Sequence, residues 1–161
     1  MSRTAKARWL IAVAVALCAV VGALVWWSKR DPAPYALRDT PEVHLTVRAT
    51  TSTYPQAKEV AGEAELLLKV YVQRLRDGDA EDLADIGAPW YTGREAAARS
   101  LISTFGAQAG HPVEAVVADP VTPGLASVEL RFKNESRQTL DLTRDNGVWW
   151  LAIGNGDPVK P

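Results

Sequence analysis

An apolar run without charged residues near the N-terminus constrains this chain more than any other feature. The run extends from Trp9 to Trp27 and has 19 residues. At a helical rise of about 1.5 Å per residue, it nearly crosses a hydrocarbon core of about 30 Å. Trp9 lies at one end and Trp26 and Trp27 at the other, and indole rings prefer the headgroup boundary. We therefore expect a transmembrane helix over residues 9–27, with these tryptophans at the interfaces and the lipid bilayer as a partner.

Basic side chains flank the run. Three of them and the α-amino group lie within residues 1–8, whereas Lys29 and Arg30 on the far side are partly offset by Asp31. The positive-inside bias favours a cytoplasmic N-terminus. Arginine outnumbers lysine twelve to six, a bias common in GC-rich bacterial genomes. We expect a single-pass protein of the bacterial cell membrane, with a cytoplasmic tail over residues 1–8 and the C-terminal domain outside the cytoplasm.

A cleaved signal peptide is the competing interpretation of the same segment. The run is longer than the usual apolar core of about 7–15 residues, and no clean Ala-x-Ala follows it. Lipoprotein processing at Cys18 is disfavoured by the bulky Leu17 before it. We favour an uncleaved signal-anchor, and cleavage stays the alternative.

The charge distribution bears on possible partners. Five basic residues and no acidic residue lie within the first thirty positions, which leaves 13 basic against 19 acidic residues from Asp31 onward, a net charge of −6. A domain this acidic is repelled by phosphate backbones, so we expect no nucleic-acid partner. Cys18 is the only cysteine, so the soluble part has neither an internal disulfide nor a cysteine metal site.

Residues 28–55 contain four prolines, which block helix continuation and favour extended or irregular backbone. Within this expected linker, residues 42–48 alternate between polar and apolar side chains. One interpretation is an added edge strand with Val43, Leu45 and Val47 facing inward. The other is a solvated tether that lifts the domain off the bilayer.

Helical periodicity begins after the linker. Lys58 to Asp77 carries an apolar stripe at three- and four-residue spacing: Val60, Ala64, Leu67, Leu68, Tyr71 and Leu75. Gly78 is placed for a left-handed C-terminal cap. Asp79 is placed to cap a second helix over Ala80 to Ile86.

A third helix is expected up to about Gln108. Thr92-Gly93-Arg94-Glu95 has the Thr-x-x-Glu form of a capping box at its start. Its apolar face consists of Ala97, Leu101 and Phe105.

The apolar period then changes to two, which indicates strands. Val113, Ala115 and Val117 form one alternating set, and Val128, Leu130 and Phe132 form another. Thr139–Thr143 and Val148–Ile153 are expected to be the last two strands.

Asn146-Gly147 predicts a two-residue type I′ hairpin loop between those last strands. This loop pairs Asp145 with Val148, Arg144 with Trp149, Leu142 with Leu151 and Leu140 with Ile153. The expected core face then contains Leu140, Leu142, Trp149, Leu151 and Ile153. Trp150 falls on the other face beside Thr143, where it either packs under the linker strand or marks a contact surface.

Two short motifs resemble the nuclear-transport-factor-two-like (cone-shaped α+β) superfamily. Gly78-Asp79-x-x-x-Leu83 resembles the loop between the first two helices of that fold, and Asn146-Gly147-Val148-Trp149 resembles its final hairpin. The resemblance covers roughly residues 56–153. It implies a membrane-anchored bacterial type with an α+β fold, in which three helices pack on a curved antiparallel sheet of four strands or more. We assign residues 56–154 to this domain and 155–161 to a tail.

The resemblance implies a conical pocket between the helices and the sheet, and the family includes enzymes, ligand-binding domains and assembly factors. The expected contact residues for a ligand or partner are aromatic: Tyr71, Trp90, Tyr91, Phe105, Trp149 and Trp150. Trp90 and Tyr91 lie between two helices, either as an aromatic wall or as a hydrophobic plug, and we favour the plug.

No catalytic constellation is recognisable in the sequence. His44 and His111 have no metal-ligand spacing, no serine lies in Gly-x-Ser-x-Gly, and Gly154-Asn155-Gly156 opens no helix. We expect no cofactor and no metal. The expected function is a non-catalytic binding or assembly module at the cell envelope, which contacts another envelope protein or itself. The alternative is a ligand-binding or isomerase-like domain that uses the cone pocket.

Overall fold

The structure is a computed structural model that describes residues 33–39, 42–50, 56–118 and 123–158. These residues belong to one compact unit, Ala33–Pro161. The anchor expected over residues 9–27, with Trp9, Trp26 and Trp27, lies outside the described residues. Among the residues that are described, no helix is both long enough and apolar enough to cross a membrane.

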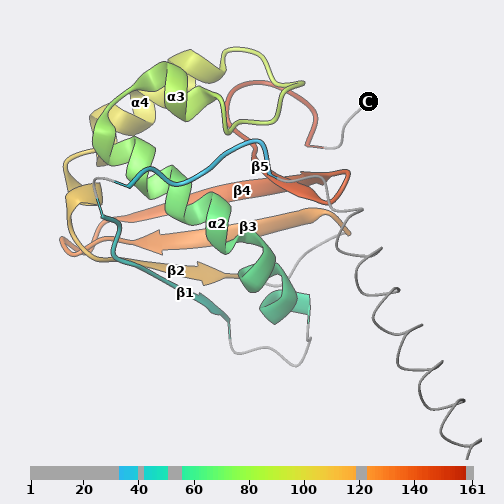
Figure 1. The fold of residues 1–161 in the computed structure, drawn as a ribbon, viewed down its shortest axis with the longest axis horizontal. Helices are drawn as coiled ribbons and strands as arrows, with labels where there is room; N and C mark the ends of the chain where they lie inside the picture. Colours follow the sequence, from blue (N-terminus) through green and yellow to red (C-terminus); the bar gives the residue numbers. More distant parts are fainter. Residues whose placement is uncertain (1–32, 40–41, 51–55, 119–122, 159–161) are drawn as a thin grey trace, which may run out of the picture. The chain divides into compact units, whose positions relative to one another are not determined.

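Three helices lie on one face of a curled sheet in the described part of the chain (Figure 1). The elements, in chain order, are β1 (Leu45–Ala49), α2 (Gln56–Asp77), α3 (Ala80–Ala84), α4 (Arg94–Phe105), a 3-10 turn (Gln108–Gly110), β2 (Val113–Val117), β3 (Leu125–Arg131), β4 (Arg137–Asp145) and β5 (Val148–Leu151). The helices precede four of the strands, as the change of period predicts. The α+β class is therefore confirmed.

The sheet is mixed, which corrects the antiparallel sheet that we expected. Its order is β1-β2-β3-β4-β5, and β1 runs parallel to β2 whereas the other neighbours are antiparallel. The three helices between β1 and β2 return the chain to the end of the sheet at which β1 began, so that β2 can run parallel to β1. Residues 45–49 therefore form the added edge strand rather than a tether. Leu45 and Val47 are half-buried, and Thr46 and Arg48 are exposed.

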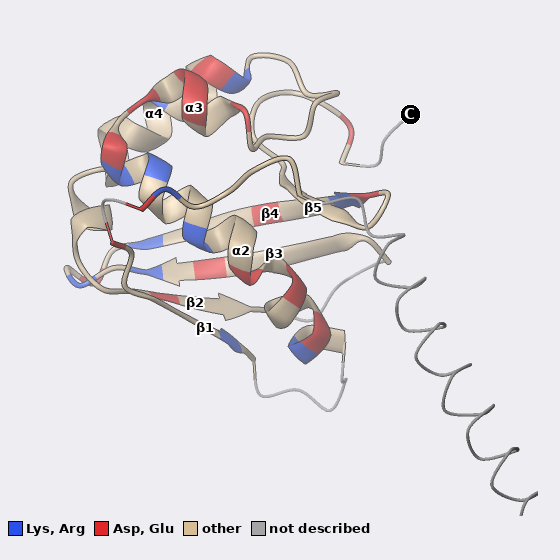
Figure 2. Cartoon of the chain, in the orientation of Figure 1, with Lys and Arg blue, Asp and Glu red and all other residues tan. Residues whose placement is uncertain are grey.

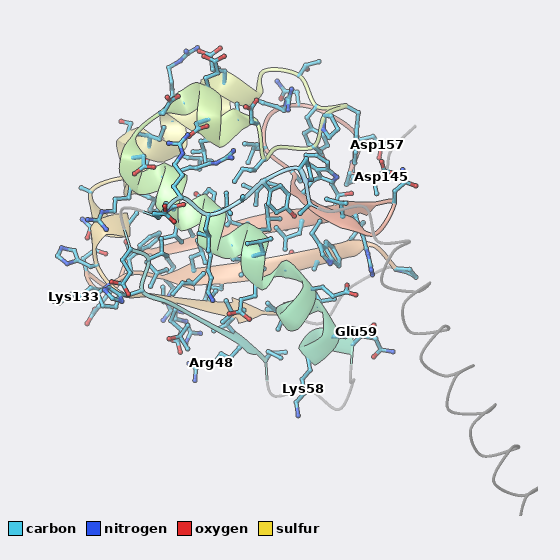
Figure 3. All side chains as sticks on the ribbon, viewed as in Figure 1. Arg48, Lys58, Glu59, Lys133, Asp145 and Asp157 are labelled. Atoms are coloured by element: carbon cyan, nitrogen blue, oxygen red, sulfur yellow. The ribbon has the colours of Figure 1, made fainter. Side chains whose placement is uncertain are left out.

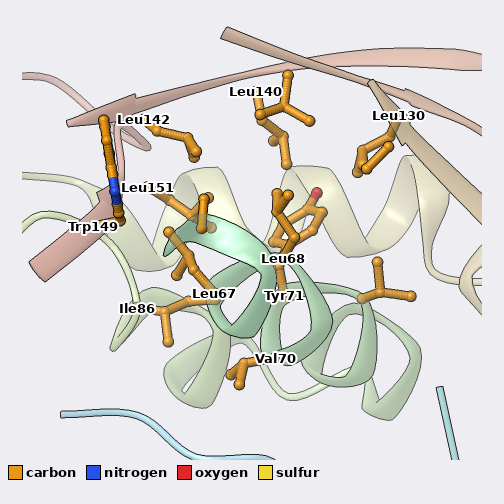
Figure 4. Packing of buried hydrophobic residues seen from close by; sticks show 14 of the residues in the cluster. Leu67, Leu68, Val70, Tyr71, Ile86, Leu130, Leu140, Leu142, Trp149 and Leu151 are labelled. Atoms are coloured by element: carbon orange, nitrogen blue, oxygen red, sulfur yellow. The ribbon is translucent and has the colours of Figure 1, made fainter. Parts of the chain in front are cut away.

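Helix α2 is the centre of the core. All six residues of the predicted stripe are at most 7% exposed. Leu68 and Tyr71 point toward the sheet, whereas Val70 points to the opposite side (Figure 4). On that side the segment 33–39 crosses α2 (Figure 1), and Val70 is fully buried. Burial on two sides gives α2 a wider apolar surface than the single predicted stripe.

Hydrogen bonds hold the segment 33–39 against the helix. The amide side chain of Gln73 accepts from the backbone N–H of Arg38 and donates to the Arg38 carbonyl, both at 2.8 Å. The Arg38 guanidinium also forms ion pairs with Asp77 and Asp82. Packing of the domain therefore begins well before residue 56.

Two of the three predicted helix caps are confirmed. Gly78 adopts a φ of 76° at the end of α2. Asp79 caps α3 by accepting from the backbone N–H groups of Glu81 and Asp82. The capping box at α4 is wrong, because the N-cap is Gly93 at a φ of 66° and has no side-chain cap. Thr92 Oγ1 donates instead to the Asn155 carbonyl, 3.1 Å away.

The hairpin register is confirmed at three of the four predicted pairs. The fourth, Leu140 with Ile153, lies beyond the ladder because β5 ends at Leu151. Asp145, Arg144 and Leu142 face Val148, Trp149 and Leu151. Asn146 and Gly147 both have positive φ, 49° and 83°, as a type I′ loop requires. The five residues of the predicted core face are all buried.

Candidate functional site

The space between helix α2 and the sheet is filled by side chains. Tyr71 is fully buried and lies among aliphatic residues of α2 and of strands β3 and β4 (Figure 4). Its hydroxyl donates to Gln138 Oε1 at 3.0 Å and accepts from Gln138 Nε2 at 2.7 Å. Burial raises the pKa of Tyr71, and the hydrogen bond from Gln138 lowers it by a smaller amount. Tyr71 is therefore a satisfied core residue.

Trp149 is anchored in the core by an acidic residue of α2. Its Nε1 donates to Glu63 Oε2 at 3.1 Å, and Arg144 forms an ion pair with the same carboxylate at 3.0 Å. The Arg144 guanidinium lies 5.6 Å from the Trp149 ring centroid. These contacts give Trp149 a structural role, since indole, guanidinium and carboxylate satisfy one another.

Trp150 packs against a residue of the expected linker. Tyr35 meets its ring edge-on at 6.0 Å, and the Tyr35 hydroxyl donates to the Trp149 carbonyl at 2.5 Å. Burial raises the pKa of Tyr35 to about 12. Trp150 is half-buried, but it does not pack under the linker strand, because β1 lies at the opposite edge of the sheet from β5. Phe105 is also half-buried and stacks on Phe132 at 5.3 Å.

The C-terminal segment, residues 154–158, is attached to the loop before α4. Thr92 and Asn155 exchange backbone hydrogen bonds of 2.9 and 2.8 Å. Trp90 Nε1 donates to the Asp157 carbonyl at 3.1 Å. A Cβ added to Gly156 would meet the Tyr91 ring at 2.8 Å, so the segment lies directly on that ring. Most of the expected tail is thus packed structure.

A cavity of about 450 Å³ opens beside this segment. Tyr91 lines it, together with outward-facing positions of β3 and β4 and with the C-terminal segment: Leu125, Ser127, Asp141, Gly156 and Pro158. Of the six aromatic contact residues expected from the sequence, this cavity includes Tyr91 alone. Tyr91 is 7% exposed, as expected of a hydrophobic plug between the helices, and it also forms part of the cavity wall.

Two aspartates influence the ionisation of the Tyr91 hydroxyl. Burial raises the pKa of Tyr91, and the carboxylates of Asp157 and Asp141 raise it further. Ser127 Oγ donates to Asp141 Oδ1 at 2.5 Å, which fixes the orientation of that carboxylate on the cavity floor. We define these residues, Tyr91, Ser127, Asp141 and the segment 154–158, as the tail cavity. It combines an apolar wall with an acidic floor.

The rest of the outer sheet face carries a chain of ion pairs across β1 to β4 (Figure 2). The network consists of Arg48, Glu114, Arg131, Glu129 and Arg137. A hydrogen bond from Arg131 lowers the pKa of Glu129. All five side chains are substantially exposed, so solvent screens the pairs and their contribution to stability is small.

The possible metal ligands within the described residues include the two histidines. No group of three or more His, Cys, Asp or Glu side chains there is arranged to hold a metal ion. His44 and His111 are both exposed. His44 precedes β1, and His111 follows the 3-10 turn, so the two histidines have structural positions at element ends.

Sequence reasoning found the aromatic wall and missed the floor of the tail cavity. Ser127 and Asp141 are ordinary outward positions of alternating strands, and their pairing follows only from the β3–β4 register. The Gly154-Asn155-Gly156 pattern was a usable signal, because Gly154 has a φ of 97°. Such a glycine marks a turn that must fit closely against another segment.

Comparison with known proteins gives little further information. No family model matches the chain, and no curated protein matches it. A solved structure from Xanthomonas campestris, described as a putative calcium/calmodulin dependent protein kinase II association domain, is 19% identical. The similarity covers 69% of this chain and 93% of that chain, with a TM-score of 0.35. A similarity this low does not assign the chain to a family.

Proposed function

We propose that the protein is a non-catalytic binding or assembly module, held at the bacterial cell envelope by a transmembrane helix over residues 9–27. The observation that carries the proposal is the filled interior. Tyr71 and Gln138 occupy the space where the cone pocket was expected, and they satisfy each other's hydrogen bonds. An isomerase-like mechanism needs an ionisable group beside a substrate there, and this interior pair is neutral.

The groups that a partner could reach from outside the domain lie on the outer sheet face. The ion-pair network and the tail cavity both face away from the helices. Such a face suits recognition of a partner, because polar and charged groups set specificity and orientation. The partner in this proposal is another envelope protein or a second copy of the chain.

A short connection separates the expected anchor from the domain. Six residue steps join Trp27 to Ala33, where the compact unit begins. Fully extended, they reach at most about 20 Å.

The proposed topology predicts an uncleaved chain with its C-terminus outside. A C-terminal alkaline phosphatase fusion, which is active only outside the cytoplasm, is expected to give signal in cells. Mass spectrometry of the purified chain is expected to find residues 9–27 retained. A mature N-terminus near Asp31, or a fusion that is active only as a cytoplasmic reporter, would show that this topology is wrong.

Partner binding is tested by affinity capture of the full chain from detergent-solubilised membranes. We expect recovery of a specific envelope protein or of a second, differently tagged copy. A matched control carries Arg131→Ala and Arg137→Ala, which interrupt the network without touching the core, and is expected to recover less partner. Equal recovery by the control would show that the ion-pair network of the outer face does not take part in partner binding. Recovery of neither partner by the unaltered chain would contradict an assembly role.

A further inference from the structure

We propose that the tail cavity binds an organic cation carried on an apolar stem, the chemistry of an alkylammonium group such as a lysine side chain. This inference rests on the proposed binding function and names the chemical class that the binding site takes. It follows from the shape of the cavity, from its charge, and from the way in which neighbouring cations are already engaged.

The cavity has the shape of a small-group site. Its volume of about 450 Å³ lies within the common range of ligand pockets, about 300–1,000 Å³. Leu125, Pro158 and the Tyr91 ring supply apolar surface for a hydrocarbon stem.

The charge of the site is negative. Asp141 is the charged residue among those that line the cavity, and Ser127 holds one of its oxygens. A carboxylate has about four acceptor positions, so one serine bond leaves capacity for an ammonium donor. Asp157 lies in the sequence between two lining residues, Gly156 and Pro158. An anionic ligand would meet repulsion from the Asp141 carboxylate.

The arginines nearest in the sequence to the lining residues are directed elsewhere. Arg144, beside the lining residue Leu142, forms its ion pair with Glu63 of α2 on the core face. Arg94 donates to the carbonyls of Ala84 and Gly87, at 3.2 and 3.1 Å. Neither guanidinium is directed at Asp141 by these contacts. These two guanidinium groups therefore leave the remaining acceptor positions of Asp141 to a ligand cation.

The test uses the full chain in a non-ionic detergent, labelled with 5-fluorotryptophan. The chain has six tryptophans, and Trp90 reports on the site because its indole donates to the Asp157 carbonyl. The Trp90→Phe variant assigns its ¹⁹F resonance. We expect n-butylammonium chloride to shift this resonance saturably, whereas 1-butanol, its neutral counterpart, and sodium chloride at equal ionic strength do not.

The binding variant is Asp141→Asn, which keeps an acceptor for Ser127 and removes the charge. Loss of a charge-assisted hydrogen bond is expected to weaken butylammonium about tenfold. Glu59→Gln is the matched control, since it also removes one negative charge, at an exposed position in the first turn of α2, apart from Asp157 in Figure 3. It is expected to bind butylammonium as the unaltered chain does.

A capped tripeptide with a central lysine distinguishes the two sources of such a cation. Its binding would identify a partner's side chain as the occupant, whereas binding of butylammonium alone would identify a free amine. Equal shifts with 1-butanol, or unchanged affinity in Asp141→Asn, would overturn the proposal. The comparison of butylammonium with 1-butanol uses the unaltered chain, so it decides the question even if Asp141→Asn does not fold. Recovery of a partner without any amine binding would refute the ligand class and leave the proposed function standing.

Discussion

Trp149→Ala is expected to lower the free energy of unfolding by about 3–5 kcal/mol, the usual cost of truncating a buried large aromatic residue. Trp149 is 3% exposed, and its indole and Arg144 share the Glu63 carboxylate. The substitution leaves a void on the core face and removes the indole N–H from that carboxylate. Urea unfolding of the full chain in mild detergent, followed by circular dichroism, measures the loss.

Trp150→Ala provides the matched control on the opposite face of the same strand. Trp150 is half-buried, and its ring meets Tyr35 edge-on. We expect it to cost about 1–2 kcal/mol, less than Trp149→Ala, because less apolar surface is lost. An equal or larger cost for Trp150→Ala would contradict the assignment of Trp149 to the core face.

Gly154→Ala is expected to cost about 2–3 kcal/mol and to detach the C-terminal segment from the loop before α4. Gly154 has a φ of 97°, a conformation that strains an L side chain. An added Cβ would also lie 2.3 Å from the Thr92 carbonyl oxygen and 3.1 Å from the Arg94 nitrogen. Urea unfolding measures the stability, and hydrogen exchange at residues 155–157 measures the detachment.

Gly62→Ala is the control for replacing a glycine. Gly62 is an exposed residue in α2, and nothing lies within 4 Å of an added Cβ. Alanine is expected to stabilise the chain by about 0.5–1 kcal/mol, because glycine is unfavourable inside a helix. If Gly154→Ala unfolded like the unaltered chain and kept its exchange protection, the segment 154–158 would not depend on the close fit at Gly154.

Local sequence signals predicted much of the helix and strand structure. The stripe from Val60 to Leu75 predicts the buried face of α2, because side chains three or four residues apart lie on one side of a helix. The same signals failed at the start of α4. The Thr-x-x-Glu pattern at Thr92 and Glu95 is compatible with a capping box, but Asn155 competes for the Thr92 hydroxyl. Glu95 forms an ion pair with Arg99 instead.

The candidate site was predictable only in part. The adjacent aromatic residues Trp90 and Tyr91 between two helices were predicted as contact residues, and Tyr91 does line a cavity. The resemblance implied a conical pocket between the helices and the sheet, whereas this cavity lies over Ser127 and Asp141 on the outward positions of β3 and β4. No local pattern connects residue 91 with residues 127, 141 and 156.

The sequence by itself determined the last hairpin and the core face of its strands. Asn146-Gly147 accepts positive φ at both loop positions, and the side-chain period of two then fixes which residues face inward. Tertiary structure alone decided the parallel position of β1, the contact of Tyr35 with Trp149 and the return of residues 154–158 to the loop before α4. The physical reason is that these contacts join residues far apart in the chain. Closing the long loops between them costs entropy, and only packing against the rest of the core offsets that cost, so no local sequence pattern specifies them.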